Sequence, residues 1–171
     1  DLSEGHYGVS LLNDCKYGHS VKDSNMALTL IKSGTEPNPT TDQEEHEFTY
    51  AIYPHKEGWR GAGTVDEAYK LNQPLTAEMG TEEGKRYSYA SVADSNVVLE
   101  TIKKAENGEG TVLRMYESEN SYTRTKLTIN AEFEKACICN LLEEVQSEAT
   151  VEGNVIDLVL KPYEVVTVLI K

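Results

Sequence analysis

The sequence is poor in cysteine, tryptophan and phenylalanine, and it contains no long apolar run. Its 171 residues include three cysteines, one tryptophan and two phenylalanines. Three cysteines are too few for the disulfide framework that stabilises small secreted domains. No stretch approaches the roughly 18 consecutive apolar residues that a membrane-spanning helix needs. We therefore exclude a disulfide-built scaffold and a helical membrane span, and we expect a cytoplasmic protein with reduced thiols.

Basic residues are also in the minority. The chain has 16 Lys and Arg against 29 Asp and Glu, a net charge of −13. The acidic excess is even, with 13 acids and 6 bases in residues 1–80 (−7) and 16 acids and 10 bases in residues 81–171 (−6). Nucleic acids and anionic membranes are bound by clustered basic surfaces. The sequence has no such cluster, so we expect neither as a partner.

The common catalytic and metal-binding motifs are missing as well. The sequence has no HExxH, no CxxC pair, no GxSxG and no phosphate-binding glycine loop. His46, between Glu45 and Glu47, could belong to a ligand cluster, although a solvated histidine at a strand edge is the more common case. Cys137 and Cys139 fall on one face of a strand, where we expect free thiols in or beside the core. We assign no catalytic residue and no metal ligand to this chain.

What the sequence does contain is a series of short apolar stretches with a period of two, separated by turn residues. This pattern predicts β-strands. We expect the first two to form a hairpin around the loop that contains Gly18 and the turn at residues 22–25. Residues 97–105 would also suit a helix capped by Ser95, but their β-branched content favours a strand. The predicted strands are residues 7–13, 26–31, 45–53, 87–93, 97–105, 111–117, 122–129, 136–142, 155–160 and 163–170.

One helix and one boundary interrupt the strands. Residues 65–71 are the best helix candidate, with Thr64 available as the N-cap. Residues 77–85 are polar and contain two glycines, which indicates a boundary. We therefore predict an all-β fold of two antiparallel β-sandwich-like units, residues 1–78 and 86–171, with at most a short helix near 65–71. The Val, Ile and Leu residues of 155–170 should supply the core of the second unit.

Trp59 and the ten tyrosines raise a second possibility. Aromatic faces pack well against sugar rings, so Trp59 could form part of a sugar-stacking platform. The chain would then be a stand-alone carbohydrate-binding β-module. Tyrosine is also favoured in strands for structural reasons alone, so both interpretations stay open.

Several segments together point to a family. They are residues 7–18 (YGVSLLNDCKYG), 26–31, 46–52 (HEFTYAI) followed by Pro54 and His55, 71–75 (LNQPL) and 160–170 (LKPYEVVTVLI). In this order they resemble the C-terminal β region of glycoside hydrolase family 38 α-mannosidases, the cytosolic type in particular. The resemblance implies a retaining parent enzyme in mannoside and glycan breakdown, with a zinc ion and an aspartate nucleophile in an N-terminal catalytic domain.

That catalytic domain has no counterpart in these residues, and the sequence begins abruptly at Asp1, so we expect a piece of a longer chain. Its function would be to support and dock the catalytic domain, and zinc would be bound by that domain. The implied partners are the catalytic domain, α-mannosides or glycans through the parent enzyme, and a second copy in a homo-oligomer.

The resemblance also implies a substrate-proximal rim. The matching residues are polar or aromatic and lie in or near the loop at 13–19: Asn13, Asp14, Lys16, Tyr17, His19 and Lys32. The alternative is a purely structural loop in which Asn13 and Asp14 satisfy nearby backbone donors.

Overall fold

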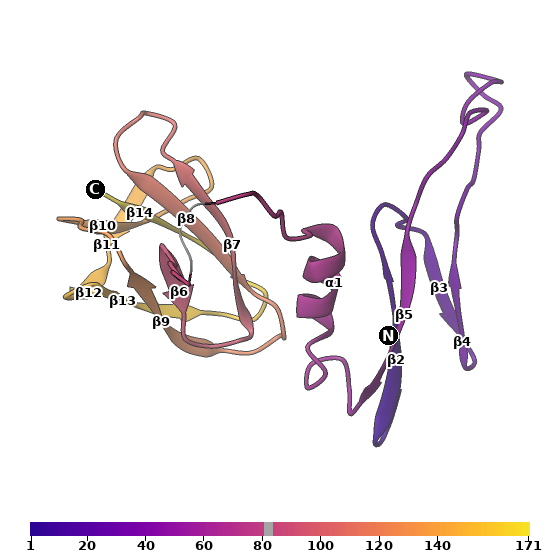
Figure 1. Cartoon of the computed structure of the whole chain (residues 1–171), viewed down its shortest axis with the longest axis horizontal. Helices are drawn as coiled ribbons and strands as arrows, with labels where there is room; N and C mark the ends of the chain where they lie inside the picture. The colour runs from indigo at the N-terminus through magenta and orange to yellow at the C-terminus, as the bar shows by residue number, and fades with distance from the viewer. Residues whose placement is uncertain (81–83) are drawn as a thin grey trace. The chain divides into compact units, whose positions relative to one another are not determined.

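Strands dominate the structure, a computed structural model that describes residues 1–80 and 84–171 (Figure 1). The chain folds into two compact units, unit 1 (Asp1–Met79) and unit 2 (Gly80–Lys171). Three residues of the predicted boundary segment lie outside the described residues. The described residues contain one helix, α1, and it is too short and too polar to cross a membrane. The prediction of an all-β fold with at most one short helix near 65–71 is confirmed.

Unit 1 is built on a three-stranded antiparallel sheet with the order β1-β2-β5. A separate hairpin pairs β3 with β4, and it lies on the opposite side of β2 and β5 from the helix in the view of Figure 1. The elements are β1 (Leu2–Glu4), β2 (Tyr7–Asn13), β3 (His19–Lys22), β4 (Asn25–Leu28), β5 (Tyr50–Lys56) and α1 (Thr64–Asn72).

The predicted hairpin between residues 7–13 and 26–31 is wrong. β2 pairs with β5 along its whole length, from Tyr7 opposite Lys56 to Asn13 opposite Tyr50. β4 pairs instead with β3. The reason is local, because Asp23 adopts a positive φ of 50° in the turn after Lys22 and closes a tight hairpin. That hairpin occupies β4 and leaves β2 free for a strand that is distant in the sequence.

The bounds of β5 also differ from those predicted. The strand begins at Tyr50 and continues to Lys56, whereas the sequence pattern predicts residues 45–53. It includes Pro54, which has no N–H to donate to a neighbouring strand. An edge strand tolerates such a residue, and β5 is an edge of its sheet.

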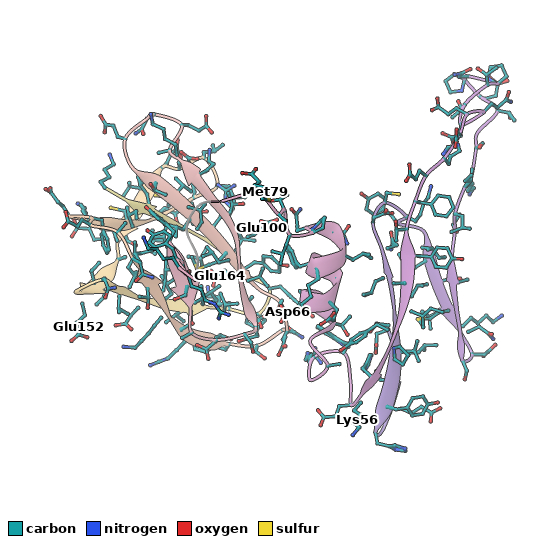
Figure 2. The ribbon with its side chains drawn as sticks, in the orientation of Figure 1. Lys56, Asp66, Met79, Glu100, Glu152 and Glu164 are labelled. Atoms are coloured by element: carbon teal, nitrogen blue, oxygen red, sulfur yellow. The ribbon has the colours of Figure 1, made fainter. Side chains whose placement is uncertain are left out.

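Helix α1 begins one residue before the predicted start and is not capped by Thr64. Its N-cap is Gly63, in the left-handed region at φ 65°, and no side chain caps the first turn. Asp66, in that first turn (Figure 2), instead places a carboxylate near the positive end of the helix dipole. The Thr64 hydroxyl is engaged elsewhere, 2.9 Å from the Ser10 Oγ on β2.

Unit 2 is a sandwich of two antiparallel sheets (Figure 1). One sheet has the order β11-β10-β14-β8-β7 and the other has the order β12-β13-β9-β6. The strands are β6 (Ala90–Val92), β7 (Val97–Lys104), β8 (Thr111–Glu117), β9 (Thr123–Ile129), β10 (Ala136–Cys139), β11 (Val145–Glu148), β12 (Thr150–Glu152), β13 (Val155–Leu160) and β14 (Val165–Ile170). The ambiguous segment at 97–105 is therefore a strand.

The core of unit 2 lies between the two sheets and follows the predicted alternation. On β13, Ile156, Leu158 and Leu160 are buried, while Asp157 points outward to within 3.6 Å of the Lys126 Nζ on β9. Residues of both sheets contribute, as predicted for 155–170. The main cluster comprises Val97, Leu113, Met115, Leu127, Ile129, Ala136, Ile156, Leu158, Leu160, Val166, Val168 and Ile170.

Unit 1, by contrast, buries no apolar side chain. All of its residues are described, and only Gly8 and Ser10 among them are buried. The 17 buried apolar residues of the structure all lie between Val97 and Ile170. The first unit is thus a layer of strands and one helix without a hydrophobic core of its own.

Candidate functional site

The loop at 13–19, where the sequence predicted rim residues, is held from inside by Asn13. This residue ends β2, and its side-chain Oδ1 accepts a hydrogen bond of 2.6 Å from the Lys16 backbone N–H. Its backbone carbonyl accepts a second bond, of 3.1 Å, from the Asn72 amide at the end of α1. Asn13 therefore joins the loop to the helix.

Asp14 joins the same loop to the segment before β5. Its carboxylate accepts the Thr49 N–H at 2.9 Å, and its own N–H donates to the Thr49 carbonyl at 3.2 Å. A hydrogen bond from the Cys15 thiol and the bond from the Thr49 N–H hold the pKa of Asp14 below its usual value. The same interaction with Asp14 raises the pKa of the Cys15 thiol. Cys15 is exposed and free, but it is poorly ionised and so a weak nucleophile.

The remaining loop residues differ in how much of them faces solvent. The Lys16 ammonium lies 4.6 Å from the centre of the Phe48 ring. The His19 ring bridges the loop, because its Nδ1 lies 3.0 Å from the Tyr17 carbonyl and its Nε2 lies 3.3 Å from the Asn13 amide nitrogen. Tyr17 is 90% exposed. The loop therefore presents Tyr17 and one side of His19 outward, while Asn13 and Asp14 satisfy nearby backbone donors.

The other two predicted residues lie outside this loop. Lys32 is exposed in the segment that follows β4. Trp59 is half-buried between β5 and α1, and the Arg60 guanidinium lies 4.5 Å from the centre of its ring. Five of the predicted residues thus share one loop, and Lys32 and Trp59 belong to other segments.

A buried polar cluster at His55 was not predicted. The His55 Nε2 lies 2.7 Å from the Asp1 Oδ2 and 3.0 Å from the Ser10 Oγ, and the His55 side chain is only 2% exposed. The Ser10 hydroxyl donates to the same Asp1 oxygen at 2.7 Å, and Thr64 lies beside it. The cluster connects residues of β2 and β5 with the start of α1. Gly8, opposite His55 in the register, is the sequence signal that could have revealed it.

The cluster contains serine, histidine and aspartate, yet it is not arranged as a nucleophilic triad. In a triad the histidine contacts the serine through one ring nitrogen and the carboxylate through the other. Here both contacts converge on the His55 Nε2, and its Nδ1 is buried without a hydrogen-bond partner. Ser10 is 1% exposed, so no substrate could reach its hydroxyl. We assign the cluster a structural role.

The described residues also show no arrangement suited to a metal ion. Within residues 1–80 and 84–171, no three His, Cys, Asp or Glu side chains gather as a coordination site. The His46 ring, which the sequence left open as a ligand, lies 2.9 Å from the backbone carbonyl of Asp42. Cys137 and Cys139 are buried and free.

A buried carboxylate in unit 2 is a fixed structural anion. Glu117 is fully buried, which by itself raises its pKa. Hydrogen bonds from the backbone N–H groups of Tyr163, Glu119 and Ser121 and from the Asn96 amide outweigh burial and lower the pKa to about 2. Glu117 therefore remains ionised and joins the end of β8 to the turn before β14.

Comparison with known families places both ends of the chain in one group of proteins. Residues 1–40 match the glycosyl hydrolases family 38 C-terminal domain. Residues 96–168 match the glycosyl hydrolases family 38 C-terminal beta sandwich domain, which corresponds to most of unit 2.

Curated relatives match the chain almost from end to end. Alpha-mannosidase 2C1 of Homo sapiens is 38% identical over 99% of the chain. Alpha-mannosidase G of Dictyostelium discoideum is 36% identical over 98%, and an alpha-mannosidase of Saccharomyces cerevisiae is 31% identical over 96%. The chain spans only 16–17% of the length of these three proteins.

Two solved structures share the fold. A family 38 glycosyl hydrolase from Enterococcus faecalis superposes with a TM-score of 0.74, and an alpha-mannosidase from Enterococcus faecalis V583 with a TM-score of 0.75. Each is 21% identical and covers 99% of this chain, which in turn covers 21% and 20% of theirs.

Proposed function

Because the chain belongs to the C-terminal region of glycosyl hydrolase family 38, we propose that it is the noncatalytic β portion of an α-mannosidase. Its role is to support and dock the catalytic domain of that enzyme. The enzyme is retaining and zinc-dependent and acts in the breakdown of mannosides and glycans in the cytoplasm. The free thiols of all three cysteines suit a reducing compartment.

The absence of a hydrophobic core in unit 1 carries this proposal. One side of its sheet forms an apolar surface that we call the Ile52 face, and its members alternate along the paired strands β2 and β5. Ile52 is 67% exposed, Tyr50 56% and Tyr7 48%. The apolar members of this face are Tyr7, Val9, Leu11, Tyr50, Ile52 and Pro54, and Asn13 and Lys56 lie on the same side of the sheet.

The energetics favour a partner for this face. Burying a large apolar side chain contributes about 1.5–3 kcal/mol, and the chain forgoes this contribution at several positions. A small sheet is stable in water only when it packs against another layer. Exposed apolar surface of this kind marks an interaction site. The catalytic domain of the same polypeptide is the partner we propose.

We further propose that the loop at 13–19 borders the substrate site of the assembled enzyme. Tyr17 and His19 are the outward-facing residues of the loop, so they would contact an α-mannoside. Asn13, Asp14 and Lys16 would fix the loop in place through the bonds described above. Lys32 would add a positive charge near the rim. The zinc ion would be held by the catalytic domain, as the resemblance to family 38 enzymes implies.

The experiment that tests the docking proposal uses two forms of the protein. The first is the isolated chain. The second is a full-length chimera in which this chain replaces the matching segment of the human relative, which is 38% identical over 177 residues. We measure α-mannoside hydrolysis by the chimera and hydrogen exchange in both forms. We expect the chimera to hydrolyse the substrate. We also expect the amides of β2 and β5 to exchange more slowly in the chimera than in the isolated chain.

The Ile52→Asp variant sharpens the test. Ile52 is 67% exposed, so the free energy of unfolding of the isolated variant should lie within about 0.5 kcal/mol of that of the parent chain. In the chimera it should reduce the yield of active enzyme at least tenfold, because it places a charge in the docked face. Val159→Asp is the matched control, since Val159 is 48% exposed on the outer surface of β13. Full activity of the Ile52→Asp chimera, with β2 and β5 unprotected, would overturn the proposal.

A further inference from the structure

The turn between β10 and β11 presents apolar side chains to solvent. Leu141 is 63% exposed, Leu142 is 79% exposed, and Val145 at the start of β11 is 56% exposed. Turns usually carry small or polar residues. Adjacent exposed leucines in a unit with a well-formed core do not contribute to its folding.

The backbone of this turn is fixed by Asn140. The Asn140 Oδ1 accepts hydrogen bonds from the N–H groups of Leu142, at 2.9 Å, and Glu144, at 3.0 Å. The Asn140 N–H donates to the Glu144 carbonyl at 3.0 Å, and the Glu143 N–H donates to the Asn140 carbonyl at 3.0 Å. The backbone that carries the two leucines is therefore ordered before any partner arrives, which lowers the entropic cost of binding.

A second set of contacts fastens the turn to the five-stranded sheet. Glu143 has a positive φ of 65°, and its carboxylate lies 2.8 Å from the Lys103 Nζ on β7. The same carboxylate accepts the Glu106 N–H at 2.7 Å. Arg114 of β8 donates to the Leu141 carbonyl at 3.2 Å. The turn is thus tied to β7, to the residues that follow β7, and to β8.

We infer that Leu141 and Leu142 form a docking knob that inserts into an apolar pocket with a basic rim, on the part of the family 38 polypeptide that this chain does not include. The inference rests on the proposed docking function. It adds a second point of attachment, in unit 2, to the Ile52 face of unit 1.

The charge of this chain, and its length relative to a family 38 protein, identify the partner that supplies the pocket. The exposed carboxylate of Glu144 lies two residues after Leu142, and the chain has a net charge of −13 that is spread over both halves. A second copy would bring like charges together at the knob, which costs free energy, whereas a basic rim would be attracted. The chain also spans only 17% of the human relative, so most of a family 38 polypeptide lies outside it and can supply the pocket.

Hydrogen exchange in the isolated chain and in the chimera tests the knob. We expect the amides of residues 140–145 to exchange at least tenfold more slowly in the chimera. The double variant Leu141→Ser/Leu142→Ser should remove this protection and lower the thermal midpoint of the chimera. The isolated double variant should unfold like the parent chain, because both side chains are exposed. Val159→Ser, on the outer surface of the other sheet, is the matched control and should change neither result.

Glu144→Gln tests the rim. A glutamine oxygen can still accept the 2.7 Å bond from the Asn140 amide, so the turn keeps its shape while one charge is removed. We expect partial loss of protection at residues 140–145, larger at low than at high salt. Unchanged protection in this variant would contradict the proposal that the pocket has a basic rim.

The remaining outcomes separate this inference from the proposed function. If the amides of β2 and β5 are protected in the chimera but those of residues 140–145 are not, the proposal that Leu141 and Leu142 dock is wrong. Docking through unit 1 would still stand. Protection of neither region would overturn both. Protection of residues 140–145 in the isolated chain that rises with its concentration would identify a second copy as the occupant and would overturn the pocket.

Discussion

Gly8 of β2 lies directly opposite His55 of β5, so close that a Cβ at Gly8 would come within 2.5 Å of the His55 Cε1. The imidazole fills the space that a side chain would need. Because His55 also contacts Asp1 and Ser10, the missing side chain at Gly8 is what permits the buried polar cluster of unit 1.

Gly8→Ala should therefore destabilise unit 1. The methyl group would displace the His55 ring and break its contacts with Asp1 and Ser10, at a cost of about 1–3 kcal/mol. Urea unfolding followed by fluorescence measures this change, because Trp59 is the only tryptophan of the chain and lies in unit 1. Gly5→Ala is the control, since nothing lies within 4 Å of a Cβ at that position. Equal urea midpoints for Gly8→Ala and Gly5→Ala would contradict the conclusion that Gly8 makes room for the His55 ring.

Glu117 should make the stability of unit 2 depend on acidity. Its pKa is about 2 in the folded chain against an ordinary value of 4.5. A carboxyl whose pKa is depressed by folding stabilises the fold above its ordinary pKa and loses that contribution as the pH falls toward the depressed value. We expect the free energy of unfolding to fall between about pH 4.5 and pH 2, as measured by urea titrations monitored by circular dichroism.

The Glu117→Gln variant isolates that contribution. It should cost about 1–3 kcal/mol at neutral pH, because a neutral amide cannot replace the carboxylate toward all of its donors. Its stability should also vary less between pH 4.5 and pH 2. Glu100→Gln, at an exposed position on β7 (labelled in Figure 2), is the matched control. An acid-dependent loss that is as steep in Glu117→Gln as in the parent chain would assign the effect to other carboxyls.

Leu127→Ala should strongly destabilise the sandwich. Leu127 is fully buried and lies opposite Ile156 on β13 and Val92 on β6. Truncating a leucine in such a position costs about 2–5 kcal/mol. Val159→Ala, on the exposed side of β13, should cost less than about 0.5 kcal/mol. Thermal unfolding by circular dichroism compares the two, and a similar loss in both would mean that the sandwich is loosely packed.

Mannose oligosaccharides should leave the fluorescence of Trp59 unchanged in the isolated chain. Trp59 is half-buried and Arg60 stacks against its ring, so a sugar would have to displace the guanidinium in order to pack there. Denaturation in urea, which exposes the indole, provides the positive control for the signal. A saturable change on titration would instead favour a stand-alone carbohydrate-binding module.

The strands of unit 2 could be predicted closely because they surround a dry core. On β13 and β8, the residues that face the core are apolar, so the sequence pattern indicates both strands. The observed bounds Val155–Leu160 and Thr111–Glu117 equal those predicted. β11 and β12 were not predicted. All of their residues are exposed, so neither strand has the apolar face by which the other strands were recognised.

Unit 1 was harder to predict because its pairing is set by contacts that alternation does not encode. Alternation shows which residues share a face, but it does not identify β5 as the partner of β2. The loop at 13–19 could be located from its motif, whereas the bond from Asn13 to the Lys16 N–H depends on the turn geometry. The polar cluster at His55 was not predicted for a related reason, since the contacts of His55 with Asp1 and Ser10 join residues that are distant in the sequence.

The position of the last two strands has a consequence for the order of assembly during synthesis. β13 lies inside the four-stranded sheet and β14 is the middle strand of the five-stranded sheet. Residues 155–170 thus separate β12 from β9 in one layer and β10 from β8 in the other. Neither layer can be completed until this segment has left the ribosome. Until then, the strands of β6–β12 expose unpaired edges to chaperones and to neighbouring nascent chains.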